Sequence, residues 1–291
     1  MAICLSALVV FSAVLGHAQD IPSDVVLAQG QQPVSLPQAL SQVRPGTVVV
    51  LGEQHGTMEQ ADQQLQVIEN IKKNGLSVSI GFEFFEAQYQ NLVDLWRHSE
   101  MNEEDFLKGI HWGAGFPFAA YRQQALAPRL NLGEQTVALN AKRSLTSKIA
   151  SQGLDNLTEQ ERAELPAGFT LGNQRYFSRF KAIMHEHVPN PEALNRYFAA
   201  QSVWDDTVAF NAQQFVATHP NQVLVIIMGE FHVQYGGGLP DRLRARGLAV
   251  TTFSLLNLKG LNSSEQKEAV EPSAEYGSRA DYVWTSRFGL Q

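Results

Sequence analysis

Five apolar runs alternate along the chain with segments in which apolar residues recur every three or four positions. The runs lie at residues 47–51, 77–85, 136–139, 223–228 and 249–253, and each ends near a glycine or a polar residue. Strands of a parallel sheet are covered on both faces, so they are apolar throughout instead of alternating. The runs therefore predict a mostly parallel sheet.

The segments between the runs predict helices at residues 58–73, 87–96, 118–130, 191–218 and 238–246. The first carries Leu65, Ile68 and Ile71 on a polar background, and the fourth follows the start signal Asn190-Pro191. When strands and helices alternate, helices pack on both faces of the sheet. We therefore expect an α/β fold.

The hydrophobic pattern divides the chain into four parts. We expect a signal peptide at 1–18, a loosely packed segment rich in Gln, Pro and Ser at 19–45, an α/β domain at 46–260, and a C-terminal tail at 261–291. The domain contains a helical insertion at about 142–200, where no run resembles a strand. The tail is polar and loop-like at 262–279, and a short strand follows at 281–284.

The first 18 residues favour export. Ala2 to Leu15 is apolar and uncharged, and small residues and then polar chain follow it, which is typical of a cleaved signal peptide. The run is too short for a membrane span, and no later segment is long and apolar enough for one. The only cysteine, Cys4, lies inside this leader and not at its cleavage point. A mature chain would therefore have no disulfide, no thiolate ligand and no lipid anchor, which predicts a periplasmic protein.

The composition limits the classes of partner that the protein is expected to bind. Hydrophobic residues make up 44% of the chain, enough for a large core, and the formal net charge is −7. Binding to nucleic acid or to anionic lipid needs a basic surface, so neither is expected.

Two near-identical units carry the chemistry. Gly52-Glu-Gln-His55 follows the first apolar run, and Gly229-Glu-Phe-His232 follows the fourth. Parallel sheets bind ligands outside the carboxyl ends of their strands, where both units are expected to lie. We expect each glycine to let the chain turn sharply, so that Glu and His face one crevice.

Further polar residues fall on neighbouring elements. Glu83 lies in the second run, Asn140 ends the third, and Gln201 and Asp205 share one face of the long helix. We expect Glu53, His55, Glu83 and His232 to form one cluster, with Asp205 and Gln201 as its second side. The histidines could instead be structural residues of the core, and Gln201 and Asp205 could be a solvated helix face.

These residues could form a metal-dependent hydrolase. His55 and His232 would bind Zn, Mn, Co or Fe together with carboxylates from Glu53, Glu83 or Asp205. A metal-bound water would attack a peptide or an ester, with one of Glu53, Glu83 and Glu230 as general base.

The same motifs also carry a family resemblance. From about Val48 to Leu255 the chain resembles the ChaN-like haem-binding, iron-regulated lipoprotein family of the Tiki/erythromycin-esterase-like superfamily. The residues that agree are the two Gly-Glu-x-His units, Gly81-Phe-Glu83, Gln201 with Asp205, Trp112, Tyr121-Arg122, Val137-Ala-Leu-Asn140 and His232-Val-Gln-Tyr235-Gly236. Two departures from the family pattern are the missing lipobox and the Asp62-Gln63 that replaces a histidine pair.

The resemblance implies a periplasmic haem- or iron-binding protein that acts in iron or haem uptake. In that family haem lies cofacially in a dimer and a tyrosine binds the iron. By this resemblance Tyr235 or Tyr121 would bind the iron, Arg122 would pair a propionate, and Gln201 would contact the cofactor. A homodimer and peripheral association with the outer membrane are further expectations. The Tiki-like branch implies metal-dependent peptide cleavage instead, so the hydrolase stays the alternative.

Overall fold

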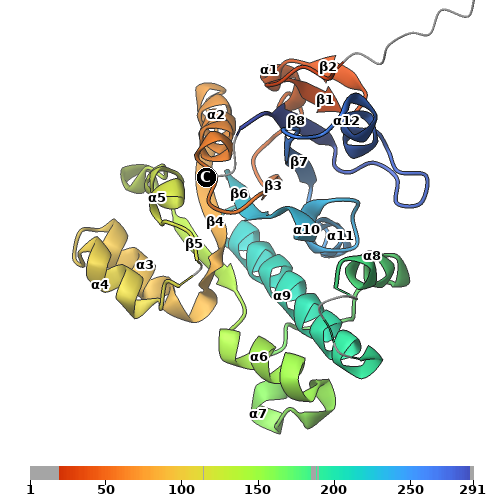
Figure 1. Ribbon diagram of the computed structural model, residues 1–291. Coiled ribbons are helices and arrows are strands. Elements are labelled where there is room, and N and C mark those ends of the chain that lie inside the picture. The colour runs from red at the N-terminus through yellow and green to blue at the C-terminus, as the bar shows by residue number, and fades with distance from the viewer. Residues whose placement is uncertain (1–19, 114, 185–187, 189, 289–291) are drawn as a thin grey trace, which may run out of the picture.

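The five apolar runs all become strands of one sheet in the computed structural model, which describes residues 20–113, 115–184, 188 and 190–288 (Figure 1). The expected leader at 1–18 lies outside these residues. The strands are β1 (Val26–Ala28), β2 (Gln32–Val34), β3 (Val48–Glu53), β4 (Ser77–Glu86), β5 (Thr136–Asn140), β6 (Gln222–Gly229), β7 (Val250–Asn257) and β8 (Tyr282–Ser286).

The sheet is mostly parallel. Its strand order is β2-β1-β8-β7-β3-β6-β4-β5, and every pair from β8 to β5 is parallel. Only β1 and β2 run antiparallel to their neighbours. The predicted α/β fold class is therefore confirmed.

Helices cover both faces of this sheet. They are α1 (Leu36–Ala39), α2 (Met58–Lys73), α3 (Gln90–Arg97), α4 (Glu103–Gly109), α5 (Ala119–Leu126), α6 (Arg143–Gln152), α7 (Glu159–Arg162), α8 (Gln174–Met184), α9 (Pro191–Thr218), α10 (Glu230–Val233), α11 (Leu239–Ala245) and α12 (Ser263–Val270), with short 3-10 turns η1 (Ala87–Tyr89), η2 (Leu130–Leu132) and η3 (Leu154–Asn156). None of the helices in the described part of the chain is long and apolar enough to cross a membrane.

Alternate residues of the central strands belong to two separate cores. Val49 and Leu51 of β3 pack with α1 to α5, whereas Val48 and Val50 pack with α9, α10 and α11. Figure 1 shows α2 and α5 on one side of the sheet and α9 to α11 on the other. Successive strand residues point to opposite faces, so each central strand contributes to both cores.

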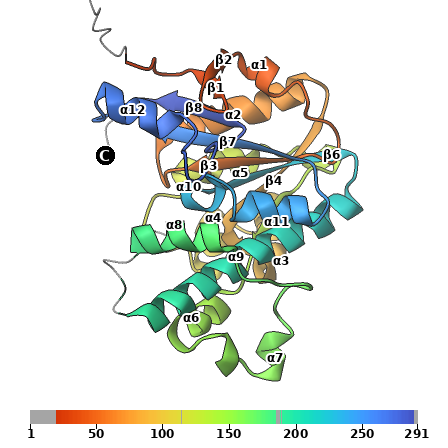
Figure 2. The same ribbon diagram turned by 90° about the vertical axis from the view of Figure 1, so that its right-hand side faces the viewer.

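The long helix α9 supports the carboxyl edge of the sheet. It begins where the sequence predicts, because the side chain of Asn190 accepts a hydrogen bond from the backbone of Ala193 and Pro191 occupies the first helical turn. Helices α6 and α7 lie below the sheet in Figure 2, with α9 between them and the strands. This placement brings α9 and the start of α6 to the ends of β4 and β5.

Two expectations about the ends of the chain are wrong. The segment 19–45 is not loosely packed, because β1 pairs with β8 and buries Val26 and Leu27. In the tail, residues expected to be loop-like form α12, which begins with a capping box between Asn262 and Glu265. The two ends of the chain stabilise each other through this pairing, a contact too distant in sequence for local patterns to indicate.

Candidate functional site

The two Gly-Glu-x-His units end adjacent parallel strands, but they are offset by one residue. In the register of β3 and β6, Glu53 pairs with Gly229, and Gly52 pairs with Met228. A shift of one residue turns a side chain to the other face of a sheet. The two glutamates therefore point to opposite faces, although their motifs are alike.

The motif glycines serve close packing and not a sharp turn, so the expected role of these residues is wrong. Neither Gly52 nor Gly229 has a positive φ, and Gly229 has a φ of −58°. A methyl group at Gly52 would collide with the carboxylate of Glu230, and one at Gly229 would lie 2.8 Å from the ring of His55. Each unit's glycine thus leaves space for a side chain of the other unit.

His55 lies between two buried carboxylates. Its Nδ1 is 2.9 Å from Oε1 of Glu53, and its Nε2 is 3.1 Å from Oε1 of Glu83. Burial alone would lower the pKa of His55, but the hydrogen bonds to both carboxylates raise it to about 10. The pKa of Glu83 lies below its usual value despite burial, because His55 and the backbone N–H of Gly229 stabilise its charge.

Glu53 is surrounded by three donors. Its Oε1 accepts hydrogen bonds from His55 and from the hydroxyl of Tyr121 at 2.5 Å, and its Oε2 accepts one from Gln64 at 2.7 Å. Burial raises the pKa of Glu53, and the donors oppose that shift only in part. Tyr121 is almost fully buried, and burial beside Glu53 raises the pKa of its hydroxyl far above the usual range.

His232 belongs to a separate group of contacts on α9 and α8. Its Nδ1 is 2.6 Å from Oδ1 of Asp205, and the amide nitrogen of Gln201 lies 2.9 Å from the same ring nitrogen. The hydroxyl of Tyr176 donates to Oδ2 of Asp205 at 2.8 Å. Burial would lower the pKa of His232, but the charge of Asp205 raises it. Gln201 and Asp205 are therefore not a solvated helix face, because they hold the imidazole of His232 in place.

Glu230 belongs neither to the group of contacts around His55 nor to the group around His232. Its Oε1 accepts hydrogen bonds from Ser254 on β7 and from Arg279, and its Oε2 is buried without a hydrogen bond among the described residues. Burial raises the pKa of Glu230, and Arg279 opposes the shift. The structure thus places Glu230 outside the contacts that join Glu53, His55 and Glu83, and its expected role as a catalytic residue stays a prediction.

The structure also separates the residues expected to bind haem. Tyr121 is buried, and its hydroxyl donates to Glu53 and accepts from the backbone of Gly56. Tyr235 lies between Arg179 and Arg279, whose guanidinium groups are 5.3 Å and 5.0 Å from its ring, in a cavity of about 30 Å³.

Arg122 is exposed on α5 and pairs with Glu103 at 2.6 Å. The cavity that it lines contains neither Tyr121 nor Tyr235. The expected combination of a tyrosine ligand with Arg122 is therefore not formed.

The expected metal centre is also not formed in the described residues. Within that part of the chain no three His, Cys, Asp or Glu side chains are grouped so that they could hold a metal ion. The reason is visible in the contacts, since the ring nitrogens of His55 face carboxylates at hydrogen-bond distance and His232 is held by Asp205 and Gln201. A metal bound to either histidine would therefore have to replace one of these hydrogen bonds.

An aromatic cavity of about 380 Å³ opens beside His55 at the carboxyl edge of β4 and β5. It is lined by Phe84, Trp112, Phe116 and Trp204, with His55 and Glu83 at its base and His111 and Arg143 among its other lining residues. The rings of Phe84 and Phe116 lie 5.1 Å and 5.3 Å from that of His55. Sequence reasoning missed His111, Phe84 and Phe116, although the aromatic composition of residues 111–118 is a signal that could have indicated a ligand surface.

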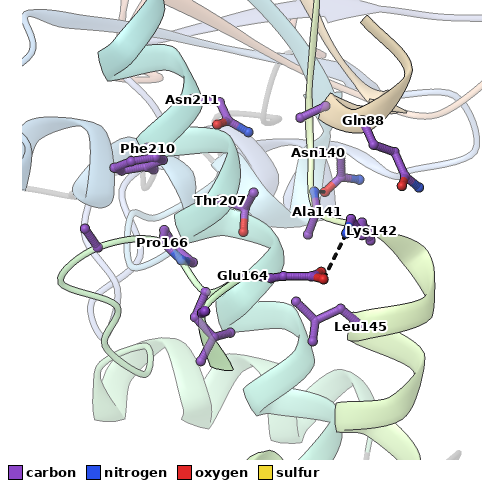
Figure 3. A pocket seen from close by; sticks show the side chains of 14 residues that line it. Gln88, Asn140, Ala141, Lys142, Leu145, Glu164, Pro166, Thr207, Phe210 and Asn211 are labelled. Atoms are coloured by element: carbon purple, nitrogen blue, oxygen red, sulfur yellow. Dashed lines mark hydrogen bonds and ion pairs between the residues drawn. The ribbon is translucent and has the colours of Figure 1, made fainter. Parts of the chain in front are cut away.

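A second cavity, of about 480 Å³, shares Asn140 and Ala141 with the first. Figure 3 shows its polar lining, with Asn211 and Thr207 on α9 facing an ion pair between Lys142 and Glu164. The amide of Asn140 donates to the backbone carbonyl of Glu83 at 2.5 Å, so the wall between the two cavities is connected to the site.

A comparison with family models matches residues 39–243 to the family described as "Haem-binding uptake, Tiki superfamily, ChaN". The chain belongs to this haem-binding family. The predicted resemblance is therefore confirmed, over more than half of the sequence. No curated protein matches the chain at a significant level.

One solved structure with a TM-score above 0.5 supports the fold, and others match less well. The structure described as "Cofacial heme binding to ChaN of Campylobacter jejuni" has a TM-score of 0.62 at 16% identity and covers 92% of this chain and 98% of that one. The type III effector HopBA1 matches with a TM-score of 0.44 at 10% identity, covering 84% and 88%. A mutant of the erythromycin esterase EreC, in its open conformation, matches with a TM-score of 0.43 at 12% identity, covering 76% and 72%. At these identities the likeness concerns the fold alone.

Proposed function

We propose that this protein binds haem in the aromatic cavity beside His55 and acts in the uptake of haem or iron. The observation that carries this proposal is the aromatic lining of the cavity by Phe84, Trp112, Phe116 and Trp204 in a chain of a haem-binding family. Flat apolar ligands bind in concave sites lined by aromatic side chains with a few polar groups.

The residues present fit a haem. A volume of about 380 Å³ lies in the range of small-molecule sites, and the exposed His111, Gly113 and Arg143 leave the cavity open at one side. The porphyrin ring would pack against the aromatic side chains, and its propionates would lie toward solvent. Arg143, the first residue of α6, replaces Arg122 as the cation that pairs a propionate, because it lines this cavity.

Titration of the purified protein with hemin tests the proposal. We expect saturable binding with a shift of the Soret band at micromolar protein, and weaker binding in Trp112→Ala. The matched control is Phe210→Ala, which removes an aromatic side chain from the second cavity and should leave binding unchanged. No Soret shift in the wild type, or equal loss in both variants, would contradict haem binding in this cavity.

The hydrolase alternative has less support. A metal would have to displace the contacts between His55 and its two carboxylates, and the carboxylate of Glu230 is bound to Ser254 and Arg279. Metal analysis after purification without chelators, together with a screen of peptide and ester substrates, tests this alternative. Stoichiometric Zn, Mn, Co or Fe with chelator-sensitive turnover would favour it over haem binding.

We further propose that the protein is exported to the periplasm. The apolar leader pattern at 1–18 supports this location, as does the uptake role in the family description. Mass spectrometry of the protein recovered from a periplasmic fraction should find a mature N-terminus near residue 19. A full-length N-terminus in the cytoplasmic fraction would contradict export.

We also propose that haem promotes a homodimer. The open side of the cavity leaves one haem face uncovered, and the related Campylobacter protein is described as binding haem cofacially. Analytical ultracentrifugation with and without hemin should show a dimer only when hemin is present. A monomer at saturating hemin would exclude this arrangement and leave haem binding itself intact.

A further inference from the structure

The aromatic cavity contains few groups that could bind haem iron. Proteins bind haem iron through His, Cys, Met or Tyr side chains. Among the described residues that line this cavity, only His55 and His111 belong to these types. The choice of ligand therefore lies between two imidazoles.

His55 is not available for ligation. Its two ring nitrogens face Glu53 at 2.9 Å and Glu83 at 3.1 Å. Binding iron through either ring nitrogen would break one of these two contacts. The geometry thus keeps His55 as part of the floor of the cavity.

His111 is exposed and lies where α4 ends. The backbone N–H of His111 donates to the carbonyl of Lys108, and that of Trp112 donates to the carbonyl of Leu107 at 2.8 Å. These two bonds form a Schellman motif, in which the residue in the position of His111 is usually glycine. His111 has a φ of +55°, which strains a residue with a β-carbon.

Strained residues cluster at functional sites, where the side chain is needed. At this position a glycine would relieve the backbone and remove the imidazole from the cavity. The ring of His111 has an edge contact with Tyr89, at 6.1 Å between ring centres, which limits its orientation. The neighbouring Trp112 and Phe116 line the same cavity with their ring planes at 82° to each other, so a flat ligand would stack on one and meet the edge of the other.

We propose that His111 is the residue of this chain that ligates the haem iron, in place of Tyr235 or Tyr121. This inference rests on the proposed haem binding and adds the identity of the ligand. The imidazole binds through a neutral ring nitrogen, while the porphyrin packs on the aromatic wall. No tyrosine among the described residues lines the cavity.

His111→Gly tests the proposal, because glycine also suits the backbone. We expect the variant to unfold at a higher urea concentration than the wild type and to bind hemin at least about tenfold more weakly, since even outer-shell partners of a metal ligand contribute that much. The Soret and charge-transfer bands should change, and the iron–imidazole stretching band of the reduced complex should vanish. Added imidazole should restore the wild-type spectrum.

The chain offers a matched control in Ser99. It ends α3 in the same motif, with a φ of +62° and hydrogen bonds to Trp96 and from Glu100 to Leu95. Ser99→Gly should raise stability in the same way and leave hemin binding unchanged. His111→Asn, whose side chain tolerates this backbone conformation, provides a second variant without an imidazole.

The outcomes separate the two proposals. If the wild type binds hemin and His111→Gly keeps its affinity and spectrum, His111 is not the ligand and haem binding stands. A wild-type spectrum of tyrosinate ligation would lead to the same conclusion. If the wild type binds no hemin, both proposals fail.

Discussion

The two Gly-Glu-x-His units share a sequence but build different environments. In the first unit Glu53 contacts the histidine of its own motif. His55 also contacts Glu83 on β4, which is separated from β3 by β6. In the second unit Glu230 is turned away from His232 toward Ser254 and Arg279. The partner of His232 comes instead from α9.

The difference follows from a shift of one residue between β3 and β6. Glu53 lies opposite Gly229, so the first glutamate faces the α2 and α5 side and the second faces the α9 and α11 side. The shift also explains why both motifs need glycine, since each glycine lies beside a functional side chain of the other strand. A repeated motif thus does not guarantee a symmetric site.

The largest expected loss of stability comes from a substitution in the contacts of the second unit. Asp205→Ala should reduce the free energy of unfolding by about 3 kcal/mol, because it leaves His232 and the hydroxyl of Tyr176 buried without their acceptor. Urea denaturation followed by circular dichroism measures the loss. Asp205→Asn keeps the shape and should cost less. A loss of under about 1 kcal/mol in the alanine variant would show that His232 does not depend on this pair.

Gly52→Ala should destabilise the protein by about 2 kcal/mol through overpacking. The added methyl group would collide with the carboxylate of Glu230, which Ser254 and Arg279 hold in place. The double variant Gly52→Ala with Glu230→Ala tests the cause in a thermodynamic cycle. The double variant should lose less free energy of unfolding than the sum of the losses in the two single variants. Strict additivity would mean that the two positions do not contact each other.

Gly229→Ala should destabilise the protein less than Gly52→Ala, by about 1 kcal/mol. The side chain of His55 is 38% exposed and has room to move toward solvent, whereas Ser254 and Arg279 hold one oxygen of the Glu230 carboxylate. The contact between His55 and Glu83 would be lost, so the pKa of His55 should fall. Histidine NMR titration of the variant measures the change, and an unaltered His55 titration would refute the predicted displacement.

The smallest expected effect is in the first unit, where the contribution of His55 to the stability of the folded protein depends on pH. The pKa of His55 is about 10 in the folded protein, against about 6.5 in an unfolded chain. A raised pKa stabilises the folded state fully below pH 6.5, and the contribution disappears as the pH rises toward 10. Glu53, Glu83 and His232 are the charged groups that act on it, and partial exposure reduces the effect.

Urea midpoints of the wild type and His55→Gln measure this contribution. The difference between them should shrink between pH 6.5 and pH 10, while His98→Gln, at an exposed position outside the aromatic cavity, should follow the wild type. A constant difference across this range would contradict the raised pKa of His55.

The sequence by itself determined the strands, the main helices and the edge of the sheet where the site lies. Continuous apolar runs such as Val48–Leu51 are typical of central strands that are covered on both faces, and Pro191 favours the first turn of α9 through local chemistry. The placement of Glu53, His55 and Glu83 together follows from the same rule, because parallel strands end at one edge.

Only the tertiary structure decided the register, the pairing of the two chain ends and the exposure of each tyrosine. A shift of one residue between β3 and β6 leaves every local pattern unchanged yet turns Glu230 to the other face. Likewise the sequence around Tyr121 does not reveal that Glu53, 68 residues away, accepts a hydrogen bond from its hydroxyl. Side-chain direction and long-range contact depend on packing between distant segments, and that information is absent from any short stretch of the chain.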